Sequence, residues 1–191
     1  MSQQVKNAFA EAKLSHFNIV LLSEIQKHRP DNAPLEQLID QMRNRAQLSE
    51  IRSLVNQAHI LGHAYMCLVW LREVVMASSG PKKGGSQHAF VDKQVLPGVQ
   101  RRFDFSGIKK LSGPRDLSDP GQMLILIRNG LSHARVEITE TTFVISDQNV
   151  QRKETVPTSV ELAWPTLGKL CDAFLFAVSD YLFPGATGDA K

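Results

Sequence analysis

The chain has 191 residues, of which 42% are hydrophobic and 21% are charged. A chain of this length buries one sizeable core, so its length favours one domain over two. The formal net charge of +3 permits an anionic partner but is too small to indicate a protein that coats nucleic acid. We expect a single domain over residues 1–183 and a flexible tail over residues 184–191.

The cysteines and the apolar segments bear on the compartment. Cys67 and Cys171 both lie in apolar stretches and form no CxxC pair, which is typical of small buried residues and not of a disulfide framework. The N-terminal segment lacks the apolar core of a signal peptide, and no uninterrupted apolar run reaches the roughly 18 residues that a membrane helix needs. We therefore expect a cytoplasmic protein that does not bind a membrane.

Helical periodicity dominates the first 77 residues. From Ser2 to His28 hydrophobic residues recur at three- and four-residue steps, which predicts a first helix that ends before Pro30. A short helix is expected to begin near Pro34, with Asn32 as its N-cap. A longer helix carries a hydrophobic stripe from Ile51 to Val75 and should be a core element.

Residues 78–120 lack this periodicity and are rich in Gly and Pro, which predicts a long connection. Eight Lys and Arg residues and two Asp residues lie between Lys82 and Arg115, so this segment carries a charge of +6. Together with Phe90, Phe103 and Phe105, these cations fit either a segment that binds an RNA backbone and stacks bases or a solvated loop with anchoring aromatics. The residues predicted to contact RNA are Arg101, Arg102, Lys109 and Lys110.

The last third of the chain combines helices and strands. Helical character returns at GQMLILIRNGLSH, and the segments ARVEITE and TTFVISD then alternate hydrophobic and polar residues, as strands do. Two strands joined near Glu140 and Thr141 predict a β-hairpin. The last helix is expected to begin at a capping box of Thr158 and Glu161. The predicted fold class is mainly α, a helical bundle with a short β-hairpin before the last helix.

Arg128, Asn129 and His133 interrupt the otherwise apolar segment ILIRNGLSHARVEI. Arginine is always charged and costly to bury without a partner, whereas histidine exchanges a proton near neutral pH. Together they suit phosphate chemistry, with a proton-transfer group acting on a ribose 2′-hydroxyl and a fixed cation stabilising charge on phosphorus. The alternative is that both cations only favour the C-terminal end of a helix that Gly130 helps to terminate.

The spacing of these residues limits how one helix can present them. In an unbroken helix Arg128 and His133 lie about 140° apart around the axis, whereas Asn129 and His133 share a face. We therefore expect that the helix ends between Gly130 and Ser132, or that a second subunit completes the site.

The pattern of Arg, a polar residue, three further residues and His after a hydrophobic helix resembles the signature of HEPN (higher eukaryotes and prokaryotes nucleotide-binding) domains. RNGLSHARVEI, followed by a hairpin and a closing helix, resembles a bacterial HEPN subgroup, most closely over residues 120–183. The resemblance implies an HEPN-like helical bundle in which Arg128, Asn129 and His133 are catalytic. It also implies a homodimer with facing motifs and metal-independent RNA cleavage that leaves a 2′,3′-cyclic phosphate. Glu73 is either an assisting acidic residue or an ordinary surface charge.

Two other motifs are weaker. His59 and His63 in HILGH have the spacing of two zinc ligands on a helix, but no Glu follows His59 and no further ligand is placed nearby in the sequence, so we expect a core or interface pair. GPKKGGS lacks the lysine before the serine and the preceding strand of a phosphate-binding loop, which favours a flexible basic loop. We expect no metal site and no cofactor.

These observations leave three hypotheses. The first is a metal-independent endoribonuclease that acts on RNA, in a toxin–antitoxin or defence system with an antitoxin protein as partner. The second is a catalytically inactive HEPN-like protein that binds RNA or nucleotides or serves as a dimeric scaffold. The third is a purely structural dimer formed through the long helix.

Overall fold

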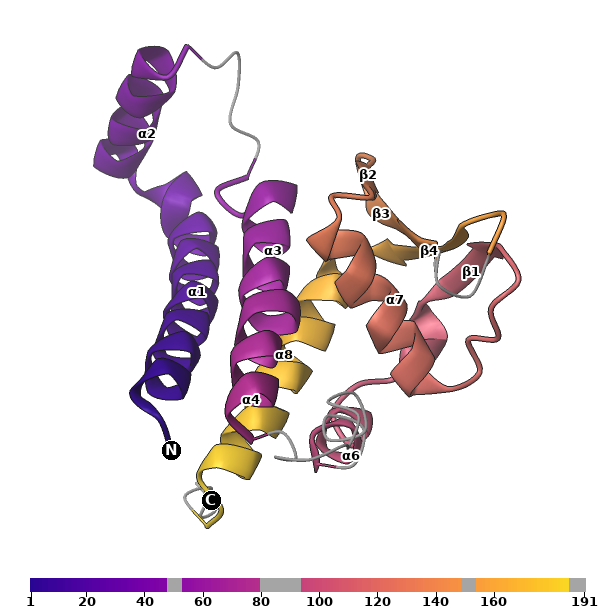
Figure 1. Ribbon diagram of the computed structural model, residues 1–191. Coiled ribbons are helices and arrows are strands. Elements are labelled where there is room, and N and C mark those ends of the chain that lie inside the picture. Colours follow the sequence, from indigo (N-terminus) through magenta and orange to yellow (C-terminus); the bar gives the residue numbers. More distant parts are fainter. Residues whose placement is uncertain (48–52, 80–93, 149–153, 186–191) are drawn as a thin grey trace.

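The computed structural model describes residues 1–47, 53–79, 94–148 and 154–185. The fold is mainly α, as predicted, with a small antiparallel sheet on one side of the helices (Figure 1). The helices are α1 (Gln3–His28), α2 (Ala33–Arg45), α3 (Gln57–Ala64), α4 (Arg72–Ser79), α6 (Leu96–Gln100), α7 (Pro120–Ser132) and α8 (Trp164–Leu182). The strands are β1 (Lys109–Ser112), β2 (Val136–Ile138), β3 (Thr142–Asp147) and β4 (Thr158–Ala163).

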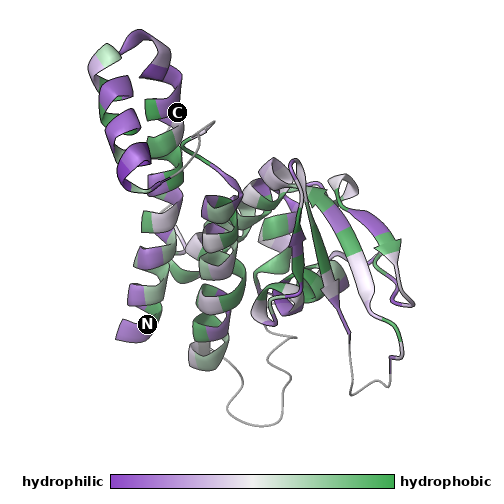
Figure 2. Ribbon diagram, turned by 90° about the horizontal axis from the view of Figure 1, so that it is seen from above, coloured by the Kyte–Doolittle hydropathy of each residue, from purple (hydrophilic) through white to green (hydrophobic). Residues whose placement is uncertain are grey.

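The first two helices begin where the sequence predicts. The Ser2 hydroxyl accepts a hydrogen bond from the Val5 amide, and the Asn32 side chain accepts one from the Leu35 amide, so each N-cap satisfies an otherwise unpaired donor. Ile39 is the only buried residue of α2. Figure 2 shows α2 as mostly hydrophilic and extending away from the other helices. The helix α2 therefore adds little to the core.

The long core helix is confirmed. It runs through α3, a π-helical stretch at Tyr65–Leu71 and α4. Gln57–Ser78 is long and apolar enough to cross a membrane, but 61% of its most apolar window is buried inside the protein. This burial identifies it as a core helix. The predicted start is too early: residues 53–56 are not helical, and the helix begins at Gln57 because the Asn56 side chain caps it. Ile51 itself lies outside the described residues.

The predicted hairpin of β2 and β3 is confirmed, and it forms part of a larger sheet with the order β1-β4-β3-β2. Phe143 and Ile145 on β3 and Val160 and Leu162 on β4 are buried on one face of this sheet. The helix α7 packs against β3, where Gly130 lies against Ile145. A side chain at position 130 would separate the helix from the sheet, so Gly130 serves close packing.

The predicted capping box is wrong. Thr158 and Glu161 lie on β4, and the last helix begins at Trp164. The physical reason is the alternation of buried and half-buried residues over Thr158–Ala163, which lets Val160 and Leu162 enter the core while the backbone pairs with β3. Tertiary pairing outweighs the local cap signal.

The predicted lack of regular structure over residues 78–120 is wrong for the part from residue 94 onward; residues 80–93 lie outside the described residues. This part contains α6, a 3₁₀ turn at Phe105–Gly107 and the edge strand β1. The helix α6 packs closely on α8, where Gly98 lies against Ala177. Helices and strands this short show too few periods for sequence patterns to reveal them.

Replacing Gly130 tests the close approach of α7 to the sheet. A Cβ at this position would overlap Ile145 and lie 2.9 Å from the carbonyl oxygen of Ser146. We expect Gly130→Ala to lower the free energy of unfolding by about 1–3 kcal/mol, because the backbone must shift. The matched control is Gly62→Ala, since an added Cβ meets nothing within 4 Å there. This exposed helical position should gain about 0.5–1 kcal/mol, measured by urea unfolding.

Candidate functional site

The helix that carries the motif ends at Ser132, within the predicted limits. The Arg135 amide donates to the Gly130 carbonyl at 2.8 Å and the Ala134 amide donates to the Leu131 carbonyl at 3.2 Å, which together form a Schellman motif. Ala134 holds the left-handed position of this motif, with φ of 53°. This Schellman motif, with Ala134 and not a glycine in the left-handed position, terminates the helix.

Arg128 is half-buried and paired. Its guanidinium forms an ion pair with Glu73 on α4 and donates a hydrogen bond to the side-chain oxygen of Asn129 at 2.7 Å. Glu73 also lies 3.3 Å from Arg72, whose side chain is buried. Glu73 is therefore not an ordinary surface charge, since it joins the long core helix to the end of α7.

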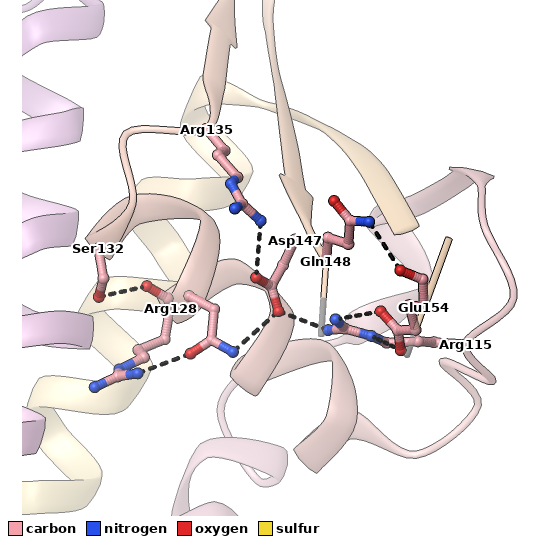
Figure 3. A network of polar contacts seen from close by, with 8 residues as sticks. Arg115, Arg128, Ser132, Arg135, Asp147, Gln148 and Glu154 are labelled. Atoms are coloured by element: carbon pink, nitrogen blue, oxygen red, sulfur yellow. Dashed lines mark hydrogen bonds and ion pairs between the residues drawn. The ribbon is translucent and has the colours of Figure 1, made fainter. Parts of the chain in front are cut away.

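A buried carboxylate fixes the other side of the motif (Figure 3). Asp147, at the end of β3, is 3% exposed, and its carboxylate accepts hydrogen bonds from Asn129 at 3.0 Å and Arg115 at 2.8 Å. Arg135 lies 3.6 Å from the second oxygen of the same carboxylate. Asp147 thus orients Asn129 and compensates its own buried charge with two guanidinium groups.

Arg115 completes this network. Its guanidinium donates two hydrogen bonds to Glu154, each 2.8 Å long, in addition to the one to Asp147. The hydrogen bond to Glu154 raises the pKa of Arg115, so the group stays charged. Gln148 donates to the Glu154 carbonyl at 2.8 Å and closes the network. Arg115 is therefore a structural cation and not a mobile basic residue.

His133 differs from its neighbours in the motif. It is the exposed C-cap residue of α7, and no hydrogen bond or ion pair of its side chain is found within the described part of the chain. The Ser132 hydroxyl bonds back to the Arg128 carbonyl at 2.9 Å. Within one chain, the structure joins Arg128 to Asn129 directly and leaves His133 at the open helix end. Completion of the site by a second subunit stays a prediction.

The residues predicted to contact RNA differ in their surroundings. Arg101 and Lys109 are exposed. Lys110 donates to the Arg115 carbonyl at 2.6 Å, and Arg102 pairs with Asp180 at 2.6 Å, so both are partly engaged.

The aromatic residues of this segment act as anchors. Phe103 is buried and packs edge-to-face on Phe105, with ring centroids 5.0 Å apart. Phe90 lies outside the described residues. Phe103 therefore does not present its ring for base stacking.

The pair of His59 and His63 is not formed. The His59 ring is exposed and accepts a hydrogen bond from the Asn56 amide at 3.3 Å, which caps α3. His63 points into the protein and bonds to Asp172 on α8. The interpretation as a core or interface pair is wrong because the two rings serve different contacts.

The sequence analysis missed the part that Asp147 plays. One signal was available: the alternation along TTFVISD places Asp147 on the same face as Phe143 and Ile145, which are buried. A carboxylate at an inward strand position requires cationic partners. No sequence signal identifies Arg115 and Arg135 as the partners of Asp147, or Glu154 as the second partner of Arg115. Only the fold brings these residues together.

Comparison with known proteins identifies the family. The model of the HEPN pEK499 p136 family matches residues 2–182. No curated protein and no solved structure matches the chain. Because the match spans nearly the whole length, the chain belongs to the HEPN pEK499 p136 family, and the resemblance inferred from the sequence is confirmed. Membership supports a nucleotide- or RNA-related function.

Replacing Asp147 tests the buried network. Asp147→Asn keeps the side-chain volume but removes the charge that Arg115 and Arg135 face, so we expect the free energy of unfolding to fall by about 3–5 kcal/mol in urea unfolding. The matched control is Asp40→Asn on α2, where the carboxylate is 56% exposed and pairs with Arg43 at 3.3 Å. The control should change stability little. Equal effects of the two substitutions would contradict a structural role for the network.

Proposed function

We propose that this protein is a metal-independent endoribonuclease, acting in a toxin–antitoxin or defence system, with Arg128, Asn129 and His133 as catalytic residues. The observation that carries the proposal is the end of α7. There a half-buried guanidinium is held by Glu73 and Asn129, and an exposed imidazole follows at the cap of the same helix. A fixed cation beside a proton-transfer group suits cleavage of a phosphodiester.

In this reaction the ribose 2′-oxygen attacks the adjacent phosphorus. The neutral imidazole of His133 accepts the 2′-hydroxyl proton as the new bond to phosphorus forms and the bond to the 5′-oxygen breaks. The leaving 5′-oxygen takes up a proton, so the products are a 2′,3′-cyclic phosphate and a 5′-hydroxyl. Arg128 stabilises the negative charge that develops on the phosphate oxygens, and Asn129 orients the phosphate.

The contacts of Arg128 suggest how a phosphate enters. The Arg128 guanidinium binds the Glu73 carboxylate. The side chain of Glu73 is 40% exposed, and that of Arg128 is 21% exposed. A phosphate competes with this carboxylate for the same planar donors, because guanidinium groups bind both anions in similar geometry. Glu73 therefore holds the arginine in place before the substrate arrives, and Asp147 does the same for Asn129.

We also propose that the active form is a homodimer in which two motifs face each other. Within one chain, Arg128 turns toward Glu73 on α4, whereas His133 lies at the exposed end of α7. A second copy brings a further imidazole and guanidinium to the same phosphate. One imidazole then acts as base and the other returns a proton to the 5′-oxygen.

The second candidate is an inactive HEPN-like protein that binds RNA or nucleotides or serves as a scaffold. The observation that favours it is the pairing of Arg128 with Glu73, which neutralises the guanidinium charge without a ligand and ties α7 to α4. In that case the motif has a structural role and His133 only caps the helix.

The two candidates predict different results for RNA cleavage. We expect the purified protein to cleave single-stranded RNA in EDTA, and Arg128→Ala and His133→Ala each to lower the rate by about 10²–10³-fold. The matched control is His28→Ala, an exposed histidine on α1. Cleavage is followed on a labelled RNA, with the cyclic phosphate detected by mass spectrometry.

Circular dichroism and light scattering must show that each variant keeps the fold and the oligomeric state of the wild type. Equal trace cleavage by the wild type and both variants indicates a contaminating nuclease and favours the inactive binding protein. Loss of cleavage in EDTA that added metal restores, while circular dichroism shows the fold unchanged in EDTA, would contradict the metal-independent reaction.

We propose that Arg101, Lys109 and Lys110 contact the RNA backbone, with a smaller part for Arg102 because Asp180 already pairs with it. Neutralising the first three residues to Gln should reduce the slope of log affinity against log salt concentration by about 2, at roughly 0.7 per phosphate contact with single-stranded RNA. The measurement is a binding titration at several salt concentrations.

A control variant removes three exposed cations of α1 and α2. Its slope should equal that of the wild type. If neutralising Arg101, Lys109 and Lys110 leaves the slope unchanged, these residues belong to a solvated surface that does not contact RNA. The control residues are Lys6, Lys13 and Arg45.

A further inference from the structure

Three helices bring metal-ligating side chains to one point, away from the motif. His16 on α1, His63 on α3 and Asp172 on α8 place their ligand atoms within 4.8 Å of one another. The Asp172 oxygen Oδ1 lies 2.8 Å from Nδ1 of His16 and 3.1 Å from Nε2 of His63. These residues are far apart in the sequence, so only the packing of the three helices forms the cluster.

We propose that His16, His63 and Asp172 form a binding site for a divalent transition-metal ion, for which Zn²⁺ is the probe. Zn²⁺ binds imidazole nitrogens and carboxylate oxygens at about 2.0–2.2 Å, which places tetrahedral ligands about 3.3 Å apart. The observed separations of 2.8 and 3.1 Å differ from this value by a few tenths of an ångström. The two imidazole nitrogens lie within 4.8 Å of each other, so the partly exposed His16 ring must move toward His63 when the ion binds.

The chemistry of the three ligands favours this class of ion. Two imidazoles and one carboxylate suit Zn²⁺ and its first-row neighbours, whereas Mg²⁺ and Ca²⁺ prefer ligand sets made of oxygens. The carboxylate neutralises one of the two charges of the ion. Burial raises the pKa of Asp172, but hydrogen bonds from His63 and His16 lower it more, so the pKa lies below its ordinary value and the group is an anion at neutral pH.

One side of the proposed metal site is buried, and the other side faces solvent. His63 is 1% exposed, whereas His16 and Asp172 are 30% and 38% exposed. Asp172 lines a surface hollow together with Thr166, Lys169 and other residues, which gives a water molecule access as the fourth ligand. The ion thus has three protein ligands and one position that faces solvent.

Neighbouring side chains hold the two imidazole rings. The His16 ring packs edge-on against Phe176, with centroids 5.8 Å apart. The Cys67 sulfur is buried and lies 3.6 Å from Nδ1 and 3.8 Å from Nε2 of His63, so it packs against that ring near both nitrogens.

A metal ion here would fasten α1 to the helical core. The buried residues of α1 end at Ala12, and beyond them Leu14 and Phe17 are exposed. Only partly buried residues such as Ile19 pack against the core beyond Ala12, so His16 provides a contact in the part of α1 that hydrophobic burial holds weakly. His63 and Glu73 lie ten residues apart along one continuous helix, or about 15 Å, so the ion does not reach the motif.

The same geometry also fits a carboxylate that merely accepts two hydrogen bonds from histidines, and metal binding separates the two cases. The protein, free of any histidine tag, is stripped with EDTA, dialysed and titrated with ZnCl₂ by calorimetry. We expect one Zn²⁺ per chain and a thermal midpoint raised by about 5–10 °C at a hundredfold excess over the dissociation constant.

His16→Gln and Asp172→Asn should each weaken Zn²⁺ binding by more than the 10- to 100-fold typical of residues that only support a ligand. Both positions are partly exposed, which favours folding of the variants, and circular dichroism verifies it. The matched control is His59→Gln, one helical turn from His63 but bonded to the Asn56 amide, and it should bind Zn²⁺ as the wild type does.

Three results would overturn the site. They are no Zn²⁺ binding by the wild type, equal binding by wild type, His16→Gln and Asp172→Asn, or a loss in His59→Gln as large as that in His16→Gln. The inference does not rest on the proposed function, because calorimetry and thermal unfolding require no RNA.

Discussion

The buried carboxylate of Asp147 is the constraint on which the arrangement of the motif depends. A buried charge is costly unless charged and hydrogen-bonding groups surround it. Asp147 therefore draws Asn129 from α7, Arg115 from the segment before α7 and Arg135 from the start of the hairpin. One carboxylate thus sets the relative positions of helix, sheet and connecting segment. Since Gly130 lets α7 approach β3 closely, the carboxylate reaches Asn129 without displacing the helix.

The long core helix links two polar clusters. Near its N-terminal end His63 meets Asp172 on α8, and in α4 Glu73 meets Arg128 on α7. The hydrophobic stretch between them holds this helix within the core, so both clusters have a rigid support. At the C-terminal end of this helix Arg128 faces the Glu73 carboxylate, and near its N-terminal end His16 and His63 face the Asp172 carboxylate. The two clusters therefore have different chemistry although they share one helix.

Local sequence patterns predict the long elements and the motif. Ser2 and Asn32 begin helices because an N-cap signal acts within four residues, and the hydrophobic stripe of the core helix repeats often enough to be recognised. The motif from Arg128 to His133 was visible because charged residues interrupt an apolar run. The family match over residues 2–182 agrees with that assignment.

The positions of the short elements and the contacts between polar groups depend on tertiary packing. The capping signal at Thr158 does not start a helix. Instead β4 forms backbone hydrogen bonds with β3 and buries its own side chains, and no local pattern reveals this pairing. The true neighbours of His63 are His16 and Asp172, not His59, because ligand spacing within one helix says nothing about contacts between helices. Local hydrogen bonds and periodicity are encoded over a few residues. The pairing of Glu73 with Arg128 depends on how whole helices pack, which no short segment of the sequence specifies.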